Sequence, residues 1–197
     1  MSYRSLALAG ALAVTLAATA HAAPIAAGSS IDINGSLQAI GGNGSVDTAT
    51  GLHFLTVRTS STASTQTGSF AGAFSTGLAG TFNDITSFSP LVAPPPLFSF
   101  TENGHTLSFT LTNLVSVVRT AAIGAIPAGL SVDGTGVFSF TGYEDTAAGY
   151  RVSTSGSGTT TFAASTLVAA AAVPEPASAA LLGLGLLGIA AVRRRLS

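Results

Sequence analysis

Two histidines are the first side chains in this sequence that could bind a metal or act as an acid–base pair. His53 and His105 lie in the middle of the chain, whereas His21 belongs to an apolar segment near its start. Neither lies in an H-x-H, H-x-x-x-H or H-E-x-x-H pattern, spacings that can bring two histidines to one metal ion. We expect both to be solvated or edge residues, with no metal site and no cofactor.

Paired carboxylates are the next candidates for chemistry. Glycoside hydrolysis uses two carboxyl groups that face each other across a cleft. Glu144 and Asp145 are adjacent, so a strand would direct them to opposite faces. The sequence Tyr143-Glu144-Asp145-Thr146 has the composition of a turn. We therefore expect no catalytic role for this pair.

Searches for three further kinds of motif give no support for a functional site. Residues 32–35 and 133–136 each begin at an aspartate and could bind calcium, but neither has the EF-hand spacing and Asx turns account for both. The G-x-G-x-x-G match at residues 183–188 lies inside an apolar run near the chain end. No G-x-S-x-G sequence occurs. The chain is therefore not expected to be an enzyme.

The composition excludes other classes of chemistry. None of the 197 residues is cysteine, and all seven basic residues are arginine. The chain thus lacks the groups needed for disulfides, thiol catalysis, P-loops and lysine Schiff bases. A net charge of −1 argues against a nucleic-acid partner, because affinity for nucleic acid comes mainly from neutralising phosphates.

Apolar and polar residues alternate through the middle of the chain. This period of two predicts strands with one buried face and one face decorated with Ser and Thr. All eleven phenylalanines fall between Phe54 and Phe162, so we expect them to form the core. The alternating apolar sets are Ile31/Ile33, Leu55/Val57, Phe98/Phe100, Leu107/Phe109/Leu111 and Phe138/Phe140.

Turn signals separate these runs and define the expected domain. Asn103-Gly104 is the strongest hairpin signal, and Asn34-Gly35, Asp133-Gly134 and residues 41–44 and 155–158 are read as further turns. We predict an all-β fold of eight to ten strands, a single antiparallel β-sandwich or barrel over residues 23–165. An Ala-rich tether is expected over residues 166–173.

The N-terminal segment has the features of a secretory signal peptide. Arg4 supplies its positive charge, an uncharged apolar run follows, and Ala20 and Ala22 are small residues at the positions that signal peptidase reads. We expect a signal helix over residues 1–22 with cleavage after Ala22, or after Ala20 as the second choice. The alternative is an uncleaved anchor.

The C-terminal segment has the features of a membrane anchor. Pro174, Glu175 and Pro176 precede an uncharged apolar run over residues 177–192, and Arg193, Arg194 and Arg195 follow it. The prolines favour a helix start after them, and the arginines favour the cytoplasmic side. We predict a single transmembrane helix with the folded region on the outer side.

This order of Pro-Glu-Pro, apolar helix and arginine cluster resembles the PEP-CTERM sorting signal of exopolysaccharide-producing Gram-negative bacteria, over residues 173–195. The resemblance implies recognition by an exosortase, a membrane-embedded transpeptidase-like enzyme that cuts near Pro174-Glu175-Pro176. It assigns a stop-transfer role to Arg193, Arg194 and Arg195, and residues 174–197 to the sorting signal. The alternative is a plain anchor that is never processed.

The expected function is that of an exported protein with a structural or adhesive role at the cell surface or in an extracellular matrix. The resemblance implies passage through the inner membrane, an anchored intermediate, and a matrix polysaccharide as a partner. The alternative is a glycan- or calcium-binding module, which a concave face with Tyr143 or Tyr150 near carboxylates would favour. An enzyme would require His53 or His105 hydrogen-bonded to a carboxylate in a cleft.

Overall fold

The computed structural model describes residues 22–60 and 66–169. The signal helix and the transmembrane helix expected from the sequence lie outside this part of the chain. Among the described residues, no helix has the length and apolar character needed to cross a membrane. The described elements are β1 (Ser30–Ile40), η1 (Val46–Thr48), β2 (Gly51–Thr59), η3 (Gly68–Phe70), β3 (Thr81–Phe82), β4 (Ser87–Phe88), β5 (Leu91–Val92), β6 (Phe98–Glu102), β7 (His105–Thr120), β8 (Gly129–Phe140), β9 (Thr146–Ser155) and β10 (Thr159–Val168).

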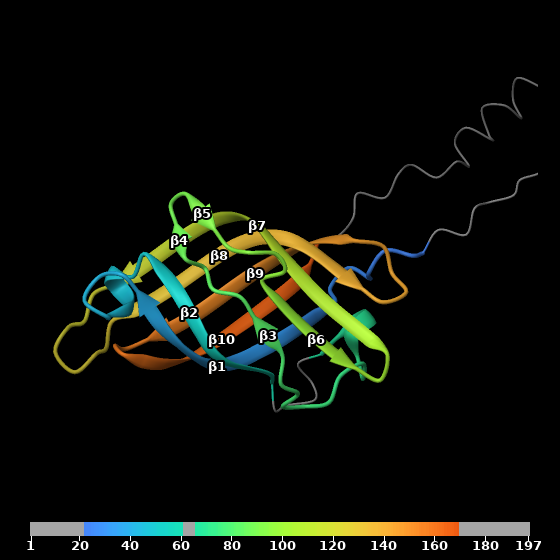
Figure 1. Cartoon of the computed structure of the whole chain (residues 1–197), viewed down its shortest axis with the longest axis horizontal. Coiled ribbons are helices and arrows are strands. Elements are labelled where there is room, and N and C mark those ends of the chain that lie inside the picture. Colours follow the sequence, from blue (N-terminus) through green and yellow to red (C-terminus); the bar gives the residue numbers. More distant parts are fainter. Residues whose placement is uncertain (1–21, 61–65, 170–197) are drawn as a thin grey trace, which may run out of the picture.

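Eight of these strands form one antiparallel sheet that curls into a nearly closed barrel (Figure 1). The order is β2-β1-β10-β9-β8-β7-β6-β3, so chain neighbours pair side by side and β1 pairs with β10. The ring closes where β2 meets the segment around β3, through isolated bridges from Arg58 to Ala79 and from Leu52 to Ile85. The sequence left sandwich and barrel open, and the structure selects the barrel-like form.

The phenylalanines fill the interior, as the sequence predicts. Ten of the eleven are buried, and Phe82 packs against the same core. Phe109 is fully buried and its ring contacts Phe98, Phe138 and Tyr150. Burying each such side chain contributes about 1.5–3 kcal/mol. The barrel is therefore filled by its own side chains.

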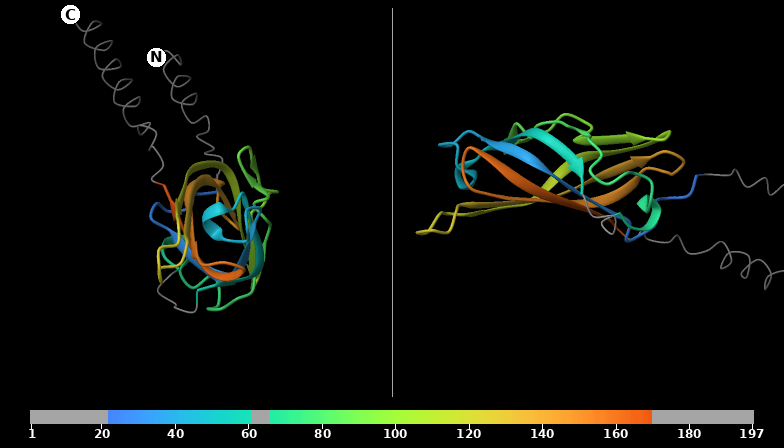
Figure 2. Two further views of the ribbon diagram at one scale, coloured as in Figure 1. Left: turned by 90° about the vertical axis from the view of Figure 1, so that its left-hand side faces the viewer. Right: turned by 90° about the horizontal axis from the view of Figure 1, so that it is seen from below.

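A short 3-10 turn covers each end of the barrel. Viewed along the axis, η1 lies across one opening (Figure 2), with Val46 and Ala49 buried beneath the neighbouring strands. At the other end, η3 places Phe70 in the core, where its ring packs edge-on to Phe138 and Phe140. Both turns thus extend the hydrophobic core to the rims.

Several turn signals mark real turns. Asn103 and Gly104 join β6 to β7 with φ of 50° and 79°, the left-handed pair expected of a two-residue hairpin turn. Residues 41–44 join β1 to η1, and residues 156–158 join β9 to β10. The strongest hairpin prediction from the sequence is therefore confirmed.

Two other turn signals, Asn34-Gly35 and Asp133-Gly134, were wrong because both lie inside strands β1 and β8. The glycines there permit close backbone approach. A Cβ on Gly35 would lie 1.8 Å from the Thr56 carbonyl oxygen, and one on Gly134 would lie 2.8 Å from the Asn113 carbonyl oxygen. Both neighbours adjoin shifts in strand register, where a bulge displaces the backbone.

The same type of irregularity corrects the alternation expected at Leu55 and Val57. The pairing of β1 with β2 passes from Ser36–Thr56 directly to Leu37–Phe54, so Leu55 is an extra residue without a partner on β1. Leu55 is consequently 43% exposed, whereas Val57 is buried. A bulge shifts the inward and outward positions by one residue.

The final strand continues beyond the domain boundary expected at residue 165. Thr166 and Val168 are both 2% exposed, and Val168 exchanges backbone hydrogen bonds with residues 28 and 29. The Ala-rich composition of residues 166–173 suggested a tether, although the alternation of buried and exposed residues continues to Val168. Because β10 pairs with β1 from Ser30–Leu167 onward, the start of β1 and the end of β10 lie side by side at the η3 end of the barrel.

Candidate functional site

The residues predicted to form the sorting signal lie outside the described chain. This applies to Pro174, Glu175, Pro176 and the arginines 193–195. Of the two alanines at the expected signal-peptide cleavage sites, Ala20 also lies outside the described chain, and Ala22 is its first residue. The described chain ends at residue 169, directly after β10. The barrel therefore runs almost to the sorting segment.

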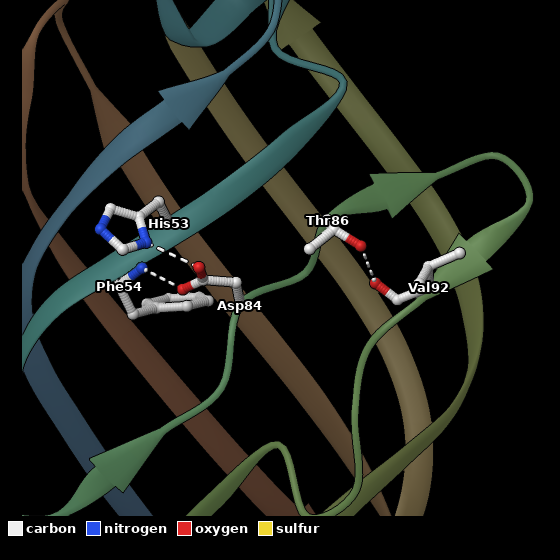
Figure 3. Close-up of polar contacts among 5 residues, drawn as sticks. All are labelled: His53, Phe54, Asp84, Thr86 and Val92. Atoms are coloured by element: carbon white, nitrogen blue, oxygen red, sulfur yellow. Dashed lines mark hydrogen bonds and ion pairs between the residues drawn. The ribbon is translucent and has the colours of Figure 1, made fainter.

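His53 does reach a carboxylate, although no sequence motif links the two. Its Nδ1 lies 2.6 Å from Oδ2 of Asp84, and the other oxygen of Asp84 accepts a hydrogen bond from the Phe54 amide at 2.9 Å (Figure 3). The Asp84 position follows from barrel closure, because neighbouring Ile85 exchanges backbone hydrogen bonds with Leu52 of β2. Only this long-range pairing brings the two side chains together.

This arrangement fixes the histidine ring. A carboxylate on Nδ1 favours the tautomer that leaves Nε2 as a base or ligand. The His53 side chain is 47% exposed on the outside of β2, and no group of three metal-ligating side chains occurs among the described residues. The contact required of an enzyme is thus present on an open surface, and its structural effect is to tie Asp84 to β2.

His105 and the adjacent carboxylates occupy the rim near the chain ends. His105 begins β7 opposite Glu102, and both belong to the β6–β7 hairpin. The Ser75 hydroxyl and amide donate to Glu102 and lower the pKa of its carboxyl group. Glu144 and Asp145 lie in the turn between β8 and β9, as predicted from their composition. The structure does not bring these groups together with His53.

A row of polar side chains crosses the outer face of five strands. Strand register aligns Ser116, Asp133, Arg151, Ser165 and Asp32 on β7, β8, β9, β10 and β1. Asp133 accepts from Arg151 Nε at 2.5 Å and from the Ser116 hydroxyl at 2.8 Å. The sequence reading missed this row because its members are far apart along the chain and meet only through register.

The electrostatics of the row follow from these contacts. The hydrogen bond from Arg151 lowers the pKa of Asp133, and the same contact raises the pKa of Arg151. Partial burial instead raises the pKa of Asp32. The centre of the row is therefore the hydrogen-bonded Asp133–Arg151 ion pair, whose two charges cancel. The carboxyl group of Asp32, at the end of the row, is easier to protonate than an ordinary aspartate.

Two shallow grooves flank Arg151 on this outer face. One, of about 450 Å³, has the exposed side chains of Val115 and Leu167 at its sides. The other, of about 300 Å³, contains Asp32, Asn34 and Ser153. The two grooves share Arg151 and Ser165, so they adjoin in one shallow depression across the strands.

The tyrosine rings that would favour a glycan-binding module do not lie on this face. Tyr150 is 3% exposed and its ring stacks on Phe109 inside the barrel. Tyr143 is 37% exposed and stacks on Phe140 at the rim. Residues 32–35 and 133–136, considered for calcium, lie within strands β1 and β8 and do not form loops.

These features describe a filled antiparallel barrel with polar groups on its outside, joined at its chain end to a C-terminal segment. The family model of the PEP-CTERM protein-sorting motif matches that segment, at residues 172–195. The chain is therefore a PEP-CTERM domain-containing protein, exported, targeted by an exosortase-type enzyme and anchored in the membrane before processing. No curated protein and no solved structure matches the chain.

Proposed function

We propose that this chain is a structural or adhesive protein of the cell surface or extracellular matrix, released from its anchor by an exosortase. The observation that carries the proposal is the position of the sorting motif. Its match begins at residue 172, and the last strand of the barrel ends at Val168. An enzyme that cuts near Pro174 would therefore free an intact barrel.

The proposed export route has two processing steps. Signal peptidase removes residues 1–22, and Ile25 then packs into the core, its amide donating to the Thr146 hydroxyl at 3.0 Å. The arginines 193–195 hold the C-terminal helix with its end in the cytoplasm until the exosortase acts. A matrix polysaccharide is the proposed partner at the destination.

A passive role fits the distribution of polar groups. The interior is occupied by phenylalanine side chains, and the outer face around the Asp133–Arg151 pair carries mainly Ser, Thr, Ala and Gly. The His53–Asp84 pair is exposed, and its carboxylate also holds a backbone amide of β2. These features support a scaffold over a catalyst.

Mass spectrometry of the exported protein tests the processing steps. We expect an N-terminus at Ala23 and a C-terminus that no longer extends to Ser197. Replacing Pro174, Glu175 and Pro176 by alanine should preserve the full C-terminus, and replacing the arginines 193–195 by glutamine should alter processing and retention. An intact C-terminus in the released protein would contradict the proposal.

Cosedimentation with the polysaccharide of the producing cells separates a scaffold from a binding module. The depression around Arg151 is the observation that favours a glycan-binding alternative. For that alternative, Arg151→Ala should abolish cosedimentation, and Arg58→Ala, at another arginine exposed on the outside of the barrel, should leave it intact. For the structural role, both variants should behave like the parent protein.

A further inference from the structure

Strand β7 has one edge that the barrel leaves open. It spans sixteen residues, but β6 pairs only with His105–Phe109. From Thr110 to Thr120, the edge turned away from β8 has no backbone hydrogen-bond partner in the described part of the chain. An open edge of this kind presents unpaired N–H and C=O groups to another chain.

Exposed apolar side chains gather on the same hairpin. Of the eight large hydrophobic side chains exposed among the described residues, four belong to β7 and the loop that follows it. They are Val115, Val118, Ile123 and Ile126, exposed by 65%, 55%, 70% and 65%. Reciprocal backbone hydrogen bonds of 3.1 and 3.0 Å between Ile123 and Ile126 hold the tip in a defined turn.

The charge distribution favours a second copy of this chain as the occupant of the edge. Between Thr106 and Val132 the sole charged residue is Arg119. Its guanidinium donates to the Ala49 carbonyl at 2.9 Å and lies over the Phe88 ring. Arg119 therefore already has contacts within its own chain. A neutral edge offers no ion pair to an acidic or basic partner, and it does not repel an identical edge.

We propose that the β7 edges of two copies of this chain pair antiparallel about a two-fold axis. Two bulges leave Thr112 and Val115 without partners on β8, and regular pairing resumes at Ser116. The stretch from Ser116 to Thr120 is therefore the regular part of the open edge. Its outward side chain with the largest exposed apolar surface is Val118, which we place at the centre of the interface.

This pairing has a consequence for where assembly occurs. The hairpin tip lies at the opposite end of the barrel from the start of β1 and the end of β10 (Figure 2). Antiparallel pairing places those chain ends at opposite ends of the dimer. Copies anchored upright in one membrane would not have this arrangement, so the pair suits released copies. This consequence rests on the proposed release, whereas the pairing itself does not.

Disulfide trapping tests the pairing directly, because the chain has no cysteine of its own. The full chain carrying Val118→Cys is extracted in mild detergent, oxidised and run on a non-reducing gel. Leu167→Cys is the matched control, an exposed outward residue on β10. We expect a disulfide-linked dimer from Val118→Cys and a monomer from Leu167→Cys, because residues facing each other across antiparallel strands meet disulfide distances.

Sedimentation of the same detergent-extracted full chain provides the second measurement. The parent protein should be dimeric, Val118→Lys should be monomeric because two cations would face each other, and Leu167→Lys should remain dimeric. A parent that is monomeric, or dimers that form equally through residue 167, would overturn the proposal. So would a Val118→Cys monomer that binds neutral phospholipid vesicles through Ile123 and Ile126, since the hairpin would then dock on lipid.

Discussion

At the scale of single residues, Tyr150 is the side chain least matched to its surroundings. Its ring stacks on Phe109 in the core, but its hydroxyl is buried and makes no hydrogen bond with any described residue. Burial also raises the pKa of this hydroxyl, so it stays neutral over the physiological range. A buried polar group without a partner costs about 1–3 kcal/mol.

Tyr150→Phe should therefore leave the fold intact and raise the free energy of unfolding, by about 1 kcal/mol. The measurement is equilibrium unfolding in urea, with Tyr143→Phe at the exposed rim as a control that should change little. A clear loss of stability in Tyr150→Phe would show that the hydroxyl has a hydrogen-bond partner.

At the scale of strands, glycines opposite bulges determine how closely neighbouring backbones can approach. A Cβ on Gly136 of β8 would lie 2.2 Å from the Thr110 carbonyl oxygen and 2.6 Å from the Phe109 ring. Gly149 of β9 is also within a strand, but its added Cβ would meet nothing closer than 3.9 Å. Gly136 and Gly149 therefore form a matched pair, in which the same substitution meets a crowded site in one case and an open site in the other.

Gly136→Ala should destabilise the barrel by about 1–3 kcal/mol, because either β7 or the Phe109 ring must move. Gly149→Ala should be neutral or stabilising by up to about 1 kcal/mol, since alanine loses less backbone entropy on folding. Thermal unfolding of the two variants checks both directions. Equal changes in stability for the two variants would contradict the close contact of Gly136 with the Thr110 carbonyl and the Phe109 ring.

At the scale of the whole molecule, the barrel depends on the pairing of its first and last long strands. Val168 accepts from the Gly28 amide at 3.1 Å and donates to the Ser29 carbonyl at 2.9 Å. The Thr166 hydroxyl donates to the Ile31 carbonyl at 3.1 Å. The residues just before the sorting motif are therefore part of the fold.

A chain that ends after Ala169 should be as stable as the full chain, and one that ends after Ser165 should have a lower free energy of unfolding. The shorter chain loses the buried Val168 side chain, worth about 1.5–3 kcal/mol, together with these hydrogen bonds. Urea unfolding of both forms, each starting at Ala23, measures the difference. Equal stability would place the end of the domain at residue 165, as the sequence predicts.

Features that depend only on residues close together in the chain could be predicted from the sequence. Alternation at residues 107–111 and 138–140 predicted strands, because side-chain direction in a strand has a period of two. Asn103-Gly104 predicted its hairpin from turn chemistry. The sorting motif was identifiable because Pro174, Glu175, Pro176 and the arginines 193–195 lie within one short segment.

Features that depend on strand register could be read only from the folded barrel. Asn34-Gly35 has the composition of a turn, yet Gly35 lies within β1, where the Thr56 carbonyl of the neighbouring strand leaves no room for a Cβ. Strand pairing likewise decides three other features. They are the His53–Asp84 pair, the row of polar side chains that contains Arg151, and the open edge of β7. Local sequence records the period of a strand but not its partner, because pairing is selected by packing of the whole barrel.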